Sequence, residues 1–193
     1  IETVRRQRLS VPAVSATALT TLAFHLKLLA LLHPSKLVID AVFHAHRFEW
    51  VQAGRYFFAQ TMPDGVQFPY AIALYVFALP WAAFTSDHVL LLRVVVCAVE
   101  AFAGLLLYPM IVRTWGDRIA GVLAVLLFSF LPLGFIVVGN ANMTNAFGRS
   151  AALVAVAASV CWSLSGRRAV AEFIGLTVLV SVALLSHVST LAL

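Results

Sequence analysis

Long apolar runs separated by short polar breaks constrain this chain more than any other feature. The runs cover residues 11–32, 89–112, 119–138, 150–164 and 169–193. About 18 or more consecutive apolar residues are enough for a helix to cross the hydrocarbon core of a bilayer. The sequence therefore predicts an all-α, polytopic bundle of transmembrane helices and a multi-pass integral membrane protein.

The composition favours a membrane protein over a soluble one. Hydrophobic residues make up 62% of the chain and charged residues 11%, whereas a soluble domain is about half apolar and about a quarter charged. The net charge of +5 lies in short clusters at the ends of the runs. There it indicates orientation in the membrane, and we expect no nucleic-acid partner. Cys97 and Cys161 lie inside apolar runs and are interpreted as small apolar residues.

The ends of the sequence predict a piece of a longer protein that is incomplete at its C-terminus. The chain begins at Ile1 without methionine and stops at Leu193 inside an apolar run. The first apolar run is too long for a cleaved signal peptide, so it is interpreted as a retained signal-anchor.

One long interruption, residues 33–88, separates the first two spans. Within it, apolar residues of segment 38–58 recur at three- and four-residue steps, which predicts an amphipathic helix lying in the membrane interface. Its apolar face is expected to hold Ile39, Val42, Phe43, Trp50, Ala53 and Phe57, and its polar face Asp40, His44 and Arg47. Trp50, Arg47 and Arg55 are also typical of plain interfacial anchors.

Residues 68–84 form a short apolar segment with two possible topologies. The segment carries Pro69 and Pro80, which kink or break helices, and it is at the lower length limit for a span. It either crosses the membrane or dips in and returns, and both topologies distribute the basic residues equally well. We prefer the return, because the first helix and its flank usually dominate. Loop 34–88 and turn 139–149 then share the non-cytoplasmic side.

A second polar constellation lies in the expected turn 139–149. Its side chains include Asn140, Asn142, Asn145 and Arg149. Asparagine amides bond hydroxyl or phosphate oxygens, and an arginine can hold a phosphate in a bidentate manner. The alternative is an ordinary turn, because Asn and Gly are turn residues.

Ionisable residues inside the spans are costly unless they are paired or hydrated. Arg93 and Glu100 share one helix face, where they would pair with other helices or line a cavity. Arg93 lies near the outer end of its span and could face a phosphate. His187 would approach the same side late in the fifth span, or serve as a hydrogen-bonded core histidine.

A metal site is not assigned. His44 and His46 would point about 200° apart on a helix and could not chelate one ion together. Asp40 with His44 is an incomplete ligand set. No cofactor is required by the sequence, although a divalent metal stays an alternative.

The order of these parts resembles the N-terminal membrane module of the GT-C superfamily of glycosyltransferases. This superfamily includes protein mannosyltransferases, oligosaccharyltransferase catalytic subunits and aminoarabinose transferases. Asp40, the stretch DGVQFPY from Asp64 to Tyr70 and the stretch GNANMTNAFG from Gly139 to Gly148 carry the resemblance. It covers the chain from about Leu9 onward.

The resemblance implies transfer of a sugar from a polyprenyl-phosphate or polyprenyl-diphosphate carrier to an acceptor on the non-cytoplasmic face. The partners would be the lipid-linked donor and membrane lipids. Asp40 stands where the family keeps its catalytic carboxylate or metal ligand. The second outer loop has asparagines where many members have an acidic residue, so either metal-independent chemistry or a divergent subfamily of unknown substrate is expected. The residues expected to bind substrate are His44, Arg47, Asp64, Arg93, Asn140, Asn142, Asn145, Arg149 and His187.

Two other functions stay open. A secondary transporter or lipid flippase would use the proline-broken segment 68–84 and the charges Arg93 and Glu100 as a translocation site. A non-enzymatic membrane scaffold would need Asp40 only as a helix cap.

Overall fold

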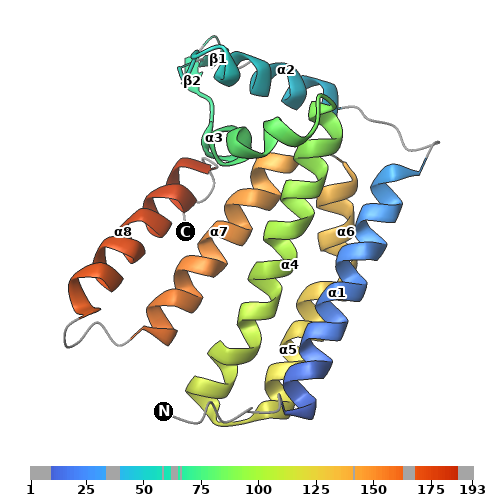
Figure 1. The fold of residues 1–193 in the computed structure, drawn as a ribbon, viewed down its shortest axis with the longest axis vertical. Helices are drawn as coiled ribbons and strands as arrows, with labels where there is room; N and C mark the ends of the chain where they lie inside the picture. The colour runs from blue at the N-terminus through green and yellow to red at the C-terminus, as the bar shows by residue number, and fades with distance from the viewer. Residues whose placement is uncertain are drawn as a thin grey trace, which may run out of the picture.

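A computed structural model describes residues 10–33, 40–57, 59–61, 65, 67–140, 142–162 and 168–186. This part of the chain is a bundle of long helices with a small cap at one end (Figure 1). The bundle consists of α1 (Val11–Leu32), α4 (His88–Trp115), α5 (Arg118–Phe130), α6 (Pro132–Gly139), α7 (Met143–Cys161) and α8 (Ala169–Ser186).

Five of the described helices are long and apolar enough to cross a membrane, when α5 and α6 are counted as one span. Their outward surfaces carry large apolar side chains, such as Leu29 on α1 and Phe173 on α8, which are 66% and 63% exposed. Water does not solvate such surfaces, whereas lipid does. The number, length and composition of these helices support the prediction of a multi-pass integral membrane protein.

The connection between α4 and α5 shows how local chemistry sets a helix boundary. Gly116 ends α4 with φ +73°, a left-handed conformation that glycine adopts without a Cβ clash. Asp117 then caps α5, because its Oδ1 accepts hydrogen bonds from the backbone N–H groups of Ile119 (2.8 Å) and Ala120 (3.1 Å). The chain therefore reverses within two residues and the two helices pack side by side.

The third span is broken rather than continuous. Leu131 has an extended backbone, with φ −59° and ψ 133°, between α5 and α6. It precedes Pro132, whose ring disfavours the helical conformation in the residue before it. The sequence predicted one helix over 119–138 with a proline inside it, and the structure corrects this to two helices.

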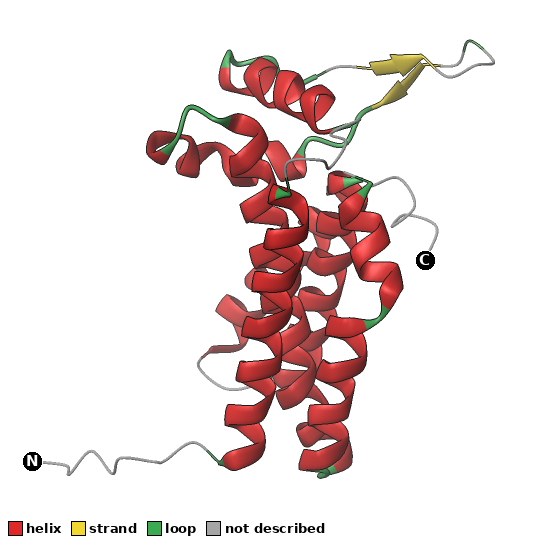
Figure 2. Cartoon of the chain, turned by 90° about the vertical axis from the view of Figure 1, so that its right-hand side faces the viewer, coloured by secondary structure: helices red, strands yellow, loops and turns green. Residues whose placement is uncertain are grey.

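The cap lies between α1 and α4 in the sequence. It consists of α2 (Ala41–Gln52), strands β1 (Ala59–Thr61) and β2 (Gln67–Pro69), α3 (Ala73–Ala78) and the 3₁₀ helix η1 (Leu79–Phe84). The strands pair antiparallel, with Gln60 opposite Phe68. Figure 2 shows α2, α3 and η1 stacked on one end of the bundle. Residues 68–84 stay at that end, which agrees with the return topology.

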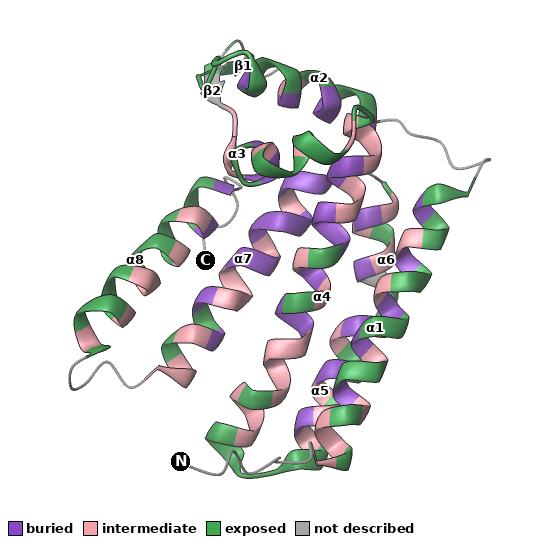
Figure 3. Cartoon of the chain, in the orientation of Figure 1, coloured by how far each residue is buried: buried purple, intermediate pink, exposed green. Residues whose placement is uncertain are grey.

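The core is densest where the cap meets the bundle. Buried residues are frequent along α4 and α7 and on α2 and α3 (Figure 3). Phe48 and Val51 from α2, Tyr75 from α3 and Leu92 from α4 are all fully buried in one cluster. Burying an aromatic or large aliphatic side chain contributes about 1.5–3 kcal/mol. The cap is therefore held firmly, and its polar residues are fixed relative to α7.

The expected turn 139–149 is mostly helical. Helix α7 begins at Met143 instead of at Ser150, so Asn145 and Arg149 lie on a helix. Met143, Ala146 and Phe147 are buried at i, i+3 and i+4 spacing. This apolar stripe packs on the neighbouring helices, and it outweighs the local turn preference of Asn and Gly.

The predicted polar face of the amphipathic helix is wrong at His44, which is buried. Helix α2 is shorter than segment 38–58, and it buries His44 together with Ala41, Ala45, Phe48 and Val51. Val42 and Trp50, assigned to the apolar face, are 49% and 38% exposed. The small side chains of the two alanines allow α2 to approach α3 and α4 closely, which turns the histidine inward.

Candidate functional site

A polar pocket of about 320 Å³ opens between the cap and the start of α7. Its lining combines a carboxylate, an imidazole, a phenol, an amide and a hydroxyl: Asp40, Phe43, His44, Tyr70, Asn142 and Thr144. Ligand sites usually measure about 300–1,000 Å³. The pocket is therefore large enough for a small polar group such as one sugar ring.

Asp40 reaches the pocket from the N-terminus of α2. Its backbone carbonyl accepts a hydrogen bond from the His44 N–H at 3.0 Å, so it begins the helix. Its side chain is exposed and makes no capping hydrogen bond to α2. A carboxylate in this position usually accepts such a bond. The capping role that a scaffold would require is therefore not filled in the described structure.

His44 lies one turn after Asp40 and is 3% exposed. Its Nδ1 atom is 2.7 Å from the hydroxyl of Tyr75 on α3. Tyr75 is itself fully buried. A buried imidazole without a hydrogen bond would cost free energy, and this contact offsets that cost while it fixes the ring orientation.

Tyr70 extends the polar chain from α3 to α7. Its hydroxyl bonds to the side chains of Thr144 and Tyr75. Burial raises the pKa of Tyr70, and the bonds to Thr144 and Tyr75 and the charge of Arg47 partly oppose this rise. Burial also raises the pKa of Tyr75 above its usual range. Both phenols therefore stay protonated near neutral pH and act as hydrogen-bonding groups.

Arg47 supplies positive charge near the pocket. Its guanidinium lies 4.9 Å from the ring centroid of Phe43, which lines the pocket, and 4.1 Å from that of Trp50. Cation–π contacts of this kind hold the guanidinium on the outer side of α2. The positive charge of Arg47 opposes the rise in the pKa of Tyr70 and Tyr75, and Tyr70 lines the pocket.

The structure brings together Asp40, His44 and Asn142 among the residues predicted to form the site. Asn142 precedes α7 and is exposed, without a side-chain capping bond to that helix. Asn140 at the end of α6 and Asn145 on α7 are not among the residues that line this pocket. Asp64 and His187 lie outside the described residues, so their predicted roles stay predictions.

Arg149 belongs to a different cluster from the pocket. Its Nη2 donates to Glu100 Oε1 at 2.8 Å, and Lys27 Nζ lies 3.1 Å from Glu100 Oε2. The Lys27 contact is an ion pair without good hydrogen-bond alignment. Three helices thus share one carboxylate, which we call the ion cluster (Lys27, Glu100 and Arg149). Lys27 and Glu100 are only 5% and 2% exposed.

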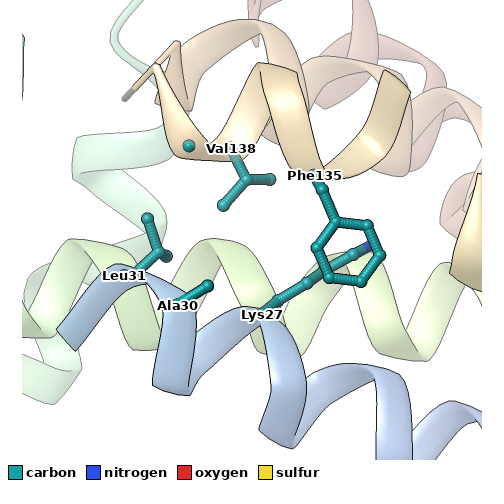
Figure 4. Close-up of a pocket in the computed structure, with 6 residues that line it drawn as sticks. Lys27, Ala30, Leu31, Phe135 and Val138 are labelled. Atoms are coloured by element: carbon teal, nitrogen blue, oxygen red, sulfur yellow. The ribbon is translucent and has the colours of Figure 1, made fainter. Parts of the chain in front are cut away.

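The ion cluster lies against the first turn of α6. A Cβ added at Gly134 would be 3.3 Å from both Glu100 Oε1 and Lys27 Nζ. Lys27 also lies 5.1 Å from the ring centroid of Phe135. Figure 4 shows Lys27 reaching from α1 toward this ring, beside a cavity of about 80 Å³ between α1 and α6.

Arg93 lies in the early part of α4 and is partly buried. Its Nε is buried and has no hydrogen-bond partner among the described residues. Arg93 is not one of the residues lining the polar pocket. The predicted contact of Arg93 with a phosphate therefore stays a prediction.

An apolar groove of about 360 Å³ runs beside η1 along α4. It is lined by Phe77, Trp81, Val94, Val95, Ala98, Val99 and Phe102. Phe77 also contacts Phe147, with ring centroids 5.4 Å apart. Phe147 follows pocket residue Thr144 by one turn of α7, so the groove and the polar pocket lie at the same end of the bundle.

No group of three or more His, Cys, Asp or Glu side chains in the described part of the chain could hold a metal ion. The pocket contributes one carboxylate and one imidazole, together with neutral oxygen groups. The expectation of metal-independent chemistry stays a prediction.

Sequence reasoning missed three contributors to the site. Tyr70, Tyr75 and Thr144 were not among the expected site residues, yet they connect α3 to α7. Tyrosines within a short apolar segment were the available signal, because a buried phenol requires a hydrogen-bond partner. Nothing in the sequence identified Lys27 as a partner of Glu100.

Comparison with known proteins finds no matching family model, no matching curated protein and no matching solved structure.

Proposed function

We propose that this protein is a membrane glycosyltransferase that takes a sugar from a polyprenyl-phosphate carrier at the capped end of the bundle. The observation that carries the proposal is the polar pocket, where Asp40 meets His44 and Asn142 at one end of the spans. A membrane anchor requires apolar surface alone. An exposed carboxylate beside a buried imidazole is a chemical arrangement that supports catalysis.

The pocket suits the demands of glycosyl transfer. An acceptor hydroxyl is a weak nucleophile until its proton is drawn away, and the negative charge of Asp40 favours that step. Asn142 and Thr144 offer donors and acceptors for sugar hydroxyls. The leaving phosphate is anionic, and the positive charge of Arg47 nearby would stabilise it.

The apolar groove beside η1 supports a lipid-linked donor. Its lining from Val94 to Phe102 follows α4 away from the cap for about 12 Å, at about 1.5 Å per residue. A hydrocarbon chain in this groove would have its phosphate end near the cap. The polar head of the donor would then occupy the polar pocket, and its apolar tail would occupy the groove.

The replacement Asp40→Asn tests this proposal. It keeps the size of the side chain and removes its charge, so we expect sugar transfer to fall by about 10²–10⁴-fold. The measurement uses membranes containing the protein and a polyprenyl-phosphate hexose with a radiolabelled sugar. The readout is radiolabel leaving the organic phase for the acceptor fraction.

Glu49→Gln on the same helix is the matched control. Its carboxylate is 53% exposed and faces His88 rather than the pocket. This variant should transfer sugar at the wild-type rate. Full activity of the Asp40→Asn protein, or equal losses in both variants, would contradict the proposed role of the pocket.

A second candidate, a secondary transporter, is favoured by one observation. The break at Leu131 lies beside the buried ion cluster, since Gly134 in the first turn of α6 approaches both Lys27 and Glu100. Broken helices beside charged groups at membrane depth form ion and substrate sites in many transporters.

Proteoliposomes separate the two candidates. A transporter would move solute across the membrane and lose this flux in a Glu100→Gln variant that remains folded. A glycosyltransferase would depend on Asp40 and would show no such flux. We favour the enzyme, because the polar pocket is open whereas the ion cluster is closed by its own pairing.

A further inference from the structure

The exposed residues of α3 and η1 are all apolar: Val76, Phe77, Pro80, Trp81, Ala83 and Phe84. Residues 71–84 contain no charged side chain. Phe84 is 81% exposed and Trp81 is 48% exposed, and their ring centroids lie 6.3 Å apart. Water solvates a continuous apolar surface poorly, so this surface marks a contact with a membrane or with another apolar partner.

The position of η1 places this surface near the boundary of the membrane. Both α3 and η1 lie across the capped end of the bundle rather than along it (Figure 1). Directly after η1, the polar residues from Thr85 to His88 lead into α4. Ionisable groups are costly inside the hydrocarbon core, so α4 leaves the core near this stretch. Tryptophan is enriched at such a boundary, which suits Trp81.

The apolar groove beside η1 continues the same surface along α4. Its α4 wall forms one stripe, with residues at i, i+1, i+4, i+5 and i+8 from Val94. Ala98, in the middle of the stripe, is exposed and contributes a single methyl group, so the groove is hollow there. Phe102, at the far end, is 54% exposed. The groove is therefore open sideways, toward the surroundings of the spans.

The groove matches one lipid leaflet in depth. The 28 residues of α4 extend about 42 Å, which exceeds a hydrocarbon core of about 30 Å by about 12 Å. When this excess is shared between the two ends, the stretch from Val94 to Phe102 covers depths of about 3–15 Å in the core. Half of the core is about 15 Å thick. The groove therefore lies within the leaflet at the capped end.

We propose that α3 and η1 rest in the leaflet at the capped end and that the groove holds one acyl chain of a phospholipid of that leaflet. The α4 wall of the groove belongs to a helix long and apolar enough to cross a membrane. The outward face of such a helix meets acyl chains, and the groove is continuous with that face. Bound lipid then sets the depth of the cap relative to the headgroups.

The fluorescence of Trp81 tests this contact, because a bromine atom quenches tryptophan only at close range. A protein with Trp50→Phe, Trp115→Phe and Trp162→Phe keeps Trp81 alone. In vesicles of phosphatidylcholine brominated midway along one acyl chain, its emission should be strongly quenched. The matched control keeps Trp50 alone, on α2, which lies farther from α7 than α3 does (Figure 1), and its emission should be quenched much less. Equal quenching of the two proteins, or none at Trp81, would overturn the proposal.

The replacement Ala98→Phe separates the groove from the rest of the lipid-facing surface. The new ring would fill the hollow that Trp81 also lines, and the core need not rearrange because Ala98 is exposed. Quenching of Trp81 by lipid brominated midway along the chain should fall, whereas quenching by lipid brominated near the glycerol should persist. Val156→Phe, at a position of α7 that is 51% exposed, is the matched control and should change neither. Unchanged quenching in Ala98→Phe would show that no chain lies in the groove.

Lipid occupancy of the groove does not depend on sugar transfer. A polyprenyl-phosphate donor would displace the acyl chain, so polyprenyl phosphate added to the brominated vesicles should restore part of the Trp81 emission. Quenching that polyprenyl phosphate does not relieve would support the bound phospholipid and count against the donor groove of the proposed glycosyltransferase. Absence of quenching at Trp81 would overturn the bound phospholipid, whatever the sugar-transfer assay shows.

Discussion

At the scale of single residues, the tyrosines of the cap explain how polar groups are kept inside an apolar protein. Tyr75 is fully buried and Tyr70 is partly buried, and each has hydrogen-bond partners. The two phenols hold the cap to α7 through Thr144 and orient His44. Leaving one buried hydroxyl without a partner would cost about 1–3 kcal/mol.

The raised pKa values of Tyr70 and Tyr75 predict a loss of stability in alkaline solution. In the unfolded chain a tyrosine ionises near pH 10, whereas in the folded protein both phenols keep their protons to higher pH. Below pH 10 these groups do not change stability with pH. Above it, the unfolded state is favoured by up to about 1.4 kcal/mol per pH unit for each phenol.

Thermal unfolding in detergent between pH 8 and pH 11 measures this effect. The wild-type midpoint should fall with pH more steeply than that of a Tyr70→Phe/Tyr75→Phe double variant. Equal slopes would show that the two phenols ionise alike in the folded and unfolded chains, contrary to the prediction.

The candidate site was partly predictable at this scale. Asp40 follows the first span, and Asn142 follows a return pair of spans, so the preferred return topology of residues 68–84 predicted that both reach the same end of the bundle. They do line one pocket. The inward position of His44 was not predictable, because it depends on the close approach of α2 to α3 and α4 rather than on the pattern within residues 38–58.

At the scale of elements, close packing of α4 against α5 depends on a glycine. A Cβ at Gly104 would lie 2.8 Å from Cδ1 of Phe128 and 3.1 Å from its Cε1. Real Cβ atoms do not approach other carbon atoms so closely. The helices therefore meet at this point because Gly104 has no side chain.

Gly104→Ala should destabilise the bundle by about 1–3 kcal/mol, because the Phe128 ring must move to make room. Thermal unfolding in detergent measures the change. Adding Phe128→Leu should recover part of the loss, because a leucine occupies less of the space that the new methyl group requires. Thr114→Ala is the control, since the Thr114 side chain is exposed and bonds to its own helix. An unfolding temperature of Gly104→Ala equal to that of the wild type would refute the packing argument.

Helix boundaries were predictable where a local signal decided them. Gly116 and Asp117 mark the reversal between α4 and α5. The break directly before Pro132 was missed, because the apolar run continues through it. The beginning of α7 was missed because Asn and Gly favour a turn locally, whereas burial of Met143 and Phe147 extends the helix. Tertiary packing determines where such a helix begins, and the local sequence pattern carries no information about that packing.

At the scale of the whole molecule, the ion cluster holds three spans together. Glu100 on α4 pairs with Lys27 on α1 and with Arg149 on α7. The high content of apolar residues predicted a membrane protein. It could not predict this pairing, because partners on distant helices meet only when the bundle has formed.

Glu100→Gln should destabilise the protein by about 3 kcal/mol, because two cations would then face each other without a carboxylate in an apolar interior. The Arg149 side chain is 35% exposed, so solvent screens part of its charge and reduces this loss of stability. Thermal unfolding in detergent measures the loss. Glu49→Gln, whose half-exposed carboxylate contacts His88 at 3.5 Å, should change stability by less than about 1 kcal/mol. Similar losses of stability in the two variants would show that the ion pairs of Glu100 do not stabilise the bundle more than the surface pair of Glu49 does.

The insertion of the cap between α1 and α4 has a consequence for biosynthesis. Asp40 and His44 leave the ribosome well before Asn142 and Thr144, which supply the remaining wall of the pocket. A nascent chain that has produced only α1 to α5 therefore carries a carboxylate and an imidazole without a binding cavity. The pocket is therefore complete only once the later helix has joined the bundle.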